Sequence, residues 1–145
     1  MIALDTNLLI YAHREGTPQH LASRRAIERA SESNRGWGVA YPCVTEFWSV
    51  ATQASPDGGA SSPAIAEAFL KELFSSGGGE LWLPCANFSW RLCHIAKDRR
   101  ITGPRIFDLQ VALIAFDNGA SQIWTHDKNF ISIPGLRVVD PLNSK

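Results

Sequence analysis

Short strand-like runs recur along this chain and alternate with stretches of helical periodicity. Residues 1–4 form an apolar run, and residues 37–41 and 121–125 are further predicted strands. Parallel strands need long crossover connections, which are usually helices, and the segments between these runs have helical patterns. The chain is therefore predicted to be one α/β domain with a central, mostly parallel β-sheet flanked by helices. At 145 residues, 45% of them hydrophobic, it is long enough for a single core.

Four acidic residues stand at notable places in this pattern. Three of them follow closely on short apolar runs, and the fourth precedes a helix that is apolar on nearly every side; they are Asp5, Glu46, Asp127 and Asp108. Residues just beyond the carboxyl ends of parallel strands converge on one crevice. The acids are therefore expected to share a pocket.

Three of the acids, taken alone, also have an ordinary structural explanation. Asp5 and Asp108 both precede predicted helices, where an aspartate is a good N-cap. Glu46 is expected on the first turn of a helix that begins after Pro42, where a solvated glutamate complements the helix dipole. Its predicted direction is away from the apolar stripe, which consists of Val44, Phe47, Trp48 and Ala51. Taken one position at a time, the sequence does not decide between these structural roles and a shared acidic pocket.

The segment after the apolar helix 109–116 adds polar neighbours to the acids. Gly119 is expected to take a left-handed conformation in the turn that ends this helix. Thr125 and Asp127 would share one face of an extended segment, and His126 would point to the opposite face, which argues against a catalytic role for this histidine.

Four segments in this order resemble the PIN-domain ribonucleases, and in particular the VapC toxins of bacterial toxin–antitoxin pairs. The resemblance covers nearly the whole chain and rests on residues 4–7 (LDTN), Glu46, residues 108–115 (DLQVALIA) and residues 125–130 (THDKNF). Two departures stand out: the loop from Ser55 to Ser62 is longer than usual, and residues 41–43 (YPC) are bulkier than expected. Neither departure changes an acid.

The resemblance implies both a site and a function. Asp5, Glu46, Asp108 and Asp127 would form a metal-binding quartet, with Asn7 and Thr125 beside it. Asp5 and Asp108 would be the most direct ligands, and Asp127 is the position whose requirement varies most among relatives. The implied protein is the toxic component of a type II toxin–antitoxin pair, a Mg²⁺-dependent endoribonuclease with an RNA substrate. Its implied partners are a cognate VapB-type antitoxin and a second copy of itself in a homodimer.

The chemistry of phosphodiester hydrolysis agrees with this implication. The reaction needs an activated water and neutralisation of charge on the phosphoryl oxygens, and Mg²⁺ or Mn²⁺ held by carboxylates supplies both. Magnesium takes oxygen ligands and keeps several waters, so no cage of histidine or cysteine is required. Four acids suit either two ions or one strong and one weak site.

Charge is balanced in total, with 14 Lys and Arg against 14 Asp and Glu. If four acids occupy one pocket, the remaining 10 face 14 bases, an excess of four positive charges. A basic surface around an acidic pocket would help a phosphate backbone to approach. Candidate contributors are Arg24, Arg25, Arg29, Lys97, Arg99, Arg100 and Arg105; the alternative is that they form solvated helix faces. The five tryptophans are expected mainly in the core.

Residues 62–76 are predicted to form a helical arm between two linkers. Ser62 and Pro63 are a helix start, and glycines follow the other end. The arm has a broad apolar stripe made of Ile65, Ala66, Phe69, Leu70, Leu73 and Phe74. This stripe either packs on its own domain or binds a partner chain, and the resemblance favours a role in antitoxin binding and dimerisation.

Three unpaired cysteines, Cys43, Cys85 and Cys93, indicate neither a zinc site nor a disulfide framework. With no charged leader or long apolar stretch, the expected location is the cytoplasm, with no membrane contact. Two other functions are compatible with parts of the sequence. An aspartate-nucleophile phosphatase needs a second acid two residues after Asp5, where Asn7 stands. A non-catalytic RNA- or protein-binding module that keeps the acids only as caps remains the alternative.

Overall fold

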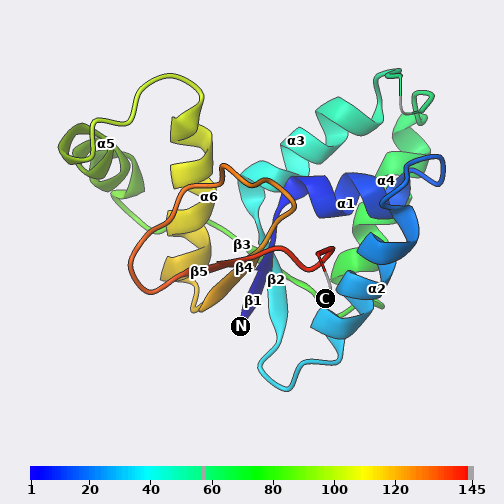
Figure 1. Ribbon diagram of the computed structural model, residues 1–145, viewed down its shortest axis with the longest axis horizontal. Coiled ribbons are helices and arrows are strands. Elements are labelled where there is room, and N and C mark those ends of the chain that lie inside the picture. The colour runs from blue at the N-terminus through cyan, green and yellow to red at the C-terminus, as the bar shows by residue number, and fades with distance from the viewer. Residues whose placement is uncertain (57, 144–145) are drawn as a thin grey trace.

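The computed structural model describes residues 1–56 and 58–143. The strands are β1 (Ile2–Leu4), β2 (Trp37–Ala40), β3 (Glu80–Trp82), β4 (Gln122–Trp124) and β5 (Arg137–Val139). The helices are α1 (Thr6–His13), α2 (His20–Ser31), α3 (Tyr41–Ala51), α4 (Pro63–Phe74), α5 (Phe88–Asp98) and α6 (Arg105–Asp117). Helices lie on both sides of the sheet, with α1, α2 and α4 on one side and α5 and α6 on the other (Figure 1).

The five strands form one sheet in the order β3-β2-β1-β4-β5, and each neighbouring pair is parallel. This arrangement confirms the predicted α/β fold class. From β1 the chain moves outward to β2 and β3, then returns to β4 on the other side of β1. The order therefore reverses between β1 and β4, and in open α/β sheets the crevice beyond the carboxyl ends at such a point is the usual binding site.

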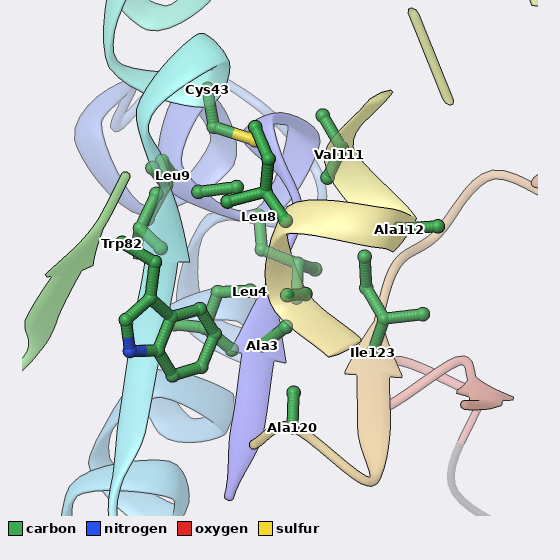
Figure 2. Packing of buried hydrophobic residues seen from close by; sticks show 14 of the residues in the cluster. Ala3, Leu4, Leu8, Leu9, Cys43, Trp82, Val111, Ala112, Ala120 and Ile123 are labelled. Carbon is green, nitrogen blue, oxygen red and sulfur yellow. The ribbon is translucent and has the colours of Figure 1, made fainter. Parts of the chain in front are cut away.

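The hydrophobic core surrounds the central strand. Ala3 and Leu4 of β1 lie between Trp82 of β3 and Ile123 of β4, beside Ala112 of α6 (Figure 2). Trp37 and Trp82 are buried as expected, whereas Trp48 and Trp90 are exposed. Gly38 is required on β2, because a Cβ atom there would lie 2.5 Å from the ring of Trp82.

Helix α3 differs from the sequence prediction in its start and in its buried face. It begins at Tyr41, so Pro42 is in the first turn, where its missing N–H costs no hydrogen bond. Glu46 is consequently in the second turn rather than the first. The buried residues are Cys43, Phe47 and Ala51, one turn apart, whereas Trp48 is 38% exposed, so its assignment to the apolar stripe was wrong.

Helix α6 also begins earlier than its apolar residues suggested. It starts at Arg105, and Pro104 occupies the N-cap position. Asp108 is therefore inside the first turn and is not a cap, which removes the structural alternative considered for it. At the other end, Gly119 has φ of 98°, the left-handed conformation predicted from the sequence.

The predicted arm corresponds to α4, and it packs on its own domain. Ala66, Leu70 and Leu73 are buried, and the ring of Phe69 stacks on that of Phe47 with 4.9 Å between centroids. Ser62 caps the helix by accepting a hydrogen bond from Ile65 N–H. A second role in binding a partner chain stays a prediction.

The described residues of the linker before α4 are anchored to the domain. Ser55 and Gly58 form an antiparallel bridge. The buried guanidinium of Arg14 donates to the Ser55 hydroxyl and to the carbonyls of Val50 and Gln53. Asp57, in the middle of this predicted linker, lies outside the described residues. No helix in the described part of the chain is long and apolar enough to cross a membrane.

Candidate active site

The four acids singled out in the sequence line one cleft at the carboxyl end of the sheet. The cleft has a volume of about 830 Å³, and its walls come from α1, α3, α6 and the segment after β4. Asp5 follows β1, Glu46 lies on α3, Asp108 on α6, and Asp127 after β4. Tertiary structure thus gathers side chains separated by up to 122 positions of the printed sequence.

Asp5 is the most enclosed of these acids and caps α1. Its Oδ1 accepts from the backbone N–H of Thr6 at 2.8 Å, and its Oδ2 accepts from the Thr125 hydroxyl at 2.8 Å. Burial raises the pKa of Asp5 to about 6, and the negative charges of Glu46 and Asp108 add to the increase, although the bonds from Thr125 and Thr6 oppose it. Asp5 is therefore both an N-cap and a cleft residue, two roles that the sequence presented as alternatives.

Asn7 and Thr125 hold the end of β1 against the end of β4. The amide nitrogen of Asn7 donates to the Thr125 hydroxyl at 2.9 Å and to Asp5 Oδ2 at 3.3 Å. Its carbonyl oxygen accepts from the backbone N–H of His126 at 3.1 Å. The two polar residues predicted beside the acids thus form one hydrogen-bonded network with Asp5.

Thr125 and Asp127 do not share the face of a strand. Strand β4 ends at Trp124, and the chain then turns so that Asp127 N–H donates back to the Thr125 hydroxyl at 3.1 Å. Thr125 is buried, whereas Asp127 is exposed and its Oδ1 accepts from Asn129 N–H at 2.8 Å. The turn, rather than the alternation of an extended strand, directs Asp127 into the cleft.

Glu46 and Asp108 complete the acidic wall from two different helices. Glu46 is exposed, and its Oε2 accepts from the Thr6 hydroxyl at 3.1 Å. Burial raises the pKa of Asp108, the charges of Asp127 and Glu46 add to the increase, and Arg105 opposes it. Thr6 was missed as a cleft residue, although its place next to Asp5 was a signal that it would lie there.

The donor set fits a hard divalent cation, because the cleft offers carboxylate oxygens together with hydroxyl and amide oxygens. As the side chains are placed, no three His, Cys, Asp or Glu residues within 1–56 and 58–143 stand close enough to hold one ion. The hydrogen bonds of Glu46 to Thr6 and of Asp127 to Asn129 explain part of this separation, because both carboxylates have protein partners. Burial is the main cause of the raised pKa values of Asp5 and Asp108, and a bound cation would offset the mutual repulsion that adds to it.

Other candidates from the sequence lie outside the cleft. His126 does not line it, and its Nδ1 pairs with the Asp140 carboxylate at 2.9 Å. Arg29 bonds the Pro141 carbonyl and covers the ring of Trp124, and Arg99 bonds the Ser132 carbonyl. None of the described residues that line the cleft is Lys, Arg or His. Of the predicted basic groups, Arg105 is the one whose charge acts on Asp108.

Comparison with known proteins identifies the family of this chain. The family model of the PIN domain matches residues 2–136, nearly the whole chain. The chain belongs to the PIN-domain family.

Two relatives match this chain over nearly its whole length and over nearly all of their own. Ribonuclease VapC43 of Mycobacterium tuberculosis is 25% identical over 145 residues, which cover 100% of this chain and 98% of the relative. Ribonuclease VapC48 of the same organism is 24% identical over 143 residues and covers 96% of each chain.

Two solved structures share the fold of this chain. Mycobacterium tuberculosis VapC20, described as a toxin that cleaves the sarcin-ricin loop, superposes with a TM-score of 0.69 at 12% identity, covering 90% of this chain and 92% of VapC20. A VapBC2 structure from Rickettsia felis, bound to a DNA fragment from the promoter, superposes with a TM-score of 0.65 at 19% identity. The match covers 96% of this chain and 98% of the chain in that structure.

Proposed function

We propose that this protein is a divalent-metal-dependent endoribonuclease and the toxic component of a type II toxin–antitoxin pair. The observation that carries the proposal is the convergence of Asp5, Glu46, Asp108 and Asp127 on one cleft at the switch point of the sheet. Family membership and the ribonuclease names of the full-length relatives support the same activity.

The charges of the cleft support its use as a cation site rather than as a set of helix caps. Asp108 is not a cap, and Glu46 is exposed on the second turn of its helix. Asp5 is buried with like charges nearby, which raises its pKa to about 6. Such an arrangement costs stability unless a cation or a proton neutralises it. A binding module that kept these acids only as caps would have no reason to gather them.

In the proposed reaction each acid has a role set by its position. Asp5 and Asp108 would hold the metal, and Thr125 and Asn7 fix the Asp5 carboxylate through their hydrogen bonds. Glu46, which accepts a hydrogen bond from Thr6, would help to hold the metal and to orient the attacking water. Asp127 completes the set from the turn after β4. Mg²⁺ or Mn²⁺, when bound, neutralises charge on the phosphoryl oxygens and activates water.

The proposed partners follow from family membership and from the names of the relatives. VapBC2 is a pair of proteins, and a matching VapB-type antitoxin is the expected partner of this chain. An antitoxin that closes the cleft would present basic side chains to the four carboxylates. A homodimer and a location in the cytoplasm complete the proposal.

Cleavage of RNA by the purified protein tests the activity. A mixed cellular RNA pool is incubated with Mg²⁺, with Mn²⁺ or with chelator, beside the Asp5→Asn and Asp108→Asn variants. The matched control is Asp98→Asn, an exposed acid on α5 outside the cleft. We expect metal-dependent fragments from the wild type and from Asp98→Asn, and none from the two cleft variants. Equal cleavage by Asp5→Asn would exclude the proposed site.

A further inference from the structure

The walls of the acidic cleft include apolar side chains as well as the four carboxylates. Besides the acids, its walls include two aromatic rings that are largely exposed, Phe107 at 62% and Tyr41 at 46%. Phe107 immediately precedes Asp108, and Tyr41 begins the helix that carries Glu46. Exposed rings gathered beside a charged site mark a contact surface.

Helical spacing explains why these two rings face the cleft. Along α3, Tyr41, Thr45 and Ser49 recur every four residues, so one stripe of that helix forms a wall of the cleft. At the start of α6, Pro104, Phe107, Asp108 and Val111 follow the spacing i, i+3, i+4 and i+7 and form a second wall. The rings thus come from two different walls, and each of these helices also carries an acid that lines the cleft.

Charge favours a base over a phosphate as the group that the rings receive. The described cleft residues include four acids and no Lys, Arg or His. Phosphates other than the one at the metal therefore gain no attraction from these walls. Stacking of bases on aromatic rings does not depend on charge and works for every base, because each base has a π-face.

We infer that Tyr41 and Phe107 bind unpaired bases next to the phosphate that is cut. In an RNA duplex the bases are stacked inside the helix and cannot stack on a ring in the wall of a cleft, whereas bases of loops and ends can be splayed out. The inference rests on the proposed ribonuclease function, because it places the rings on the substrate of that site.

Binding measured without cleavage separates this inference from the proposed activity. The Asp5→Asn variant is titrated into a fluorescently labelled single-stranded oligoribonucleotide of mixed sequence, and separately into the corresponding duplex. Tyr41→Ala and Phe107→Ala are added to this background. The control is Trp90→Ala, which removes a ring that is 77% exposed on α5 outside the cleft.

We expect each cleft substitution to weaken single-strand binding about tenfold, with duplex binding and the Trp90→Ala control unchanged. Phe107→Tyr should keep the affinity because it keeps a ring. Phe107→Leu should lose it, because leucine keeps apolar volume without a π-face. Unchanged single-strand affinity in both alanine variants, or full affinity in Phe107→Leu, would overturn the inference. The second result would indicate instead a surface for an aliphatic side chain of a protein partner.

The two proposals fail in different experiments. Absence of metal-dependent cleavage by the wild type would overturn the ribonuclease proposal, while ring-dependent binding of single strands would still support the role of Tyr41 and Phe107. Conversely, cleavage that is unaltered in rate and position by Tyr41→Ala and Phe107→Ala would overturn the role of the rings and leave the acidic site in place.

Discussion

The hydroxyl of Thr125 donates to Oδ2 of Asp5 at 2.8 Å, across 120 positions of the sequence. The two residues follow β4 and β1, which are adjacent in the sheet at the point where the strand order reverses. This one bond therefore links the two halves of the fold directly at the candidate site. It also opposes the increase in the pKa of Asp5 that burial causes.

Replacing Thr125 by valine tests this link. Valine has a similar shape but no hydroxyl, so Asp5 loses its nearest side-chain donor and Asn7 loses an acceptor. We expect the free energy of unfolding at pH 7.5 to fall by about 1.5 to 3 kcal/mol, the range for hydrogen bonds to charged groups. Urea unfolding measures it. Thr125→Ser keeps the hydroxyl and should retain most of the stability; equal losses in both variants would show that the methyl group matters and the hydrogen bond does not.

The pH dependence of stability tests the environment of Asp5. Its pKa is about 6 in the folded protein, against an ordinary value of 3.8, so the folded state binds the proton more tightly. This contribution to stability is present below pH 4 and is lost as the pH rises through 6. Relative to Asp5→Asn, which does not titrate, the wild type should lose up to about 3 kcal/mol between pH 4 and pH 7.5.

Urea unfolding of both proteins in chelator at several pH values measures this difference. The same comparison between the wild type and Asp98→Asn controls for general effects of pH, because Asp98 is exposed on α5. A wild-type curve that runs parallel to that of Asp5→Asn would contradict the raised pKa. Relative to Asp108→Asn, the wild type should also lose stability as the pH rises, because the pKa of Asp108 is raised as well.

Divalent ions should stabilise the protein through the same carboxylates. At pH 7.5 and an ion concentration 100 times Kd, we expect Mn²⁺ or Mg²⁺ to raise the Tm by about 5 to 10 °C. The increase should be smaller at pH 5, where Asp5 is largely protonated. Thermal unfolding with metal alone measures it and needs no RNA. Asp5→Asn and Asp108→Asn should lose most of the increase, and an undiminished increase in both would place the ion elsewhere.

Arg14 is predicted to stabilise the fold by holding the end of α3. Its buried guanidinium caps the carbonyls of Val50 and Gln53 at the end of α3, the helix that carries Glu46. Arg14→Met keeps the apolar stem but removes these donors, and we expect a loss of at least about 2 kcal/mol. Arg25→Met, an exposed position on α2, is the control and should change little. Urea unfolding compares the two, and an equal effect in both would contradict the capping role.

Much of the fold could be predicted from local sequence. The left-handed Gly119 and the start of α4 at Ser62 and Pro63 each depend on backbone preferences of a few residues. The face of α3 could not be predicted in the same way. Whether Trp48 or Cys43 is buried depends on which neighbouring elements cover the helix, and periodicity alone carries no information on these neighbours.

The sequence by itself determined the chemistry of the site, because the four acids and their order along the chain identify the residues that can meet. Only the tertiary structure decided how they meet. Asp5 is both cap and cleft residue because β1 and β4 bring Thr125 to its carboxylate. Asp127 enters the cleft because a turn, not a strand, follows β4. These outcomes depend on contacts between distant segments, whose burial and charge no local pattern of residues specifies.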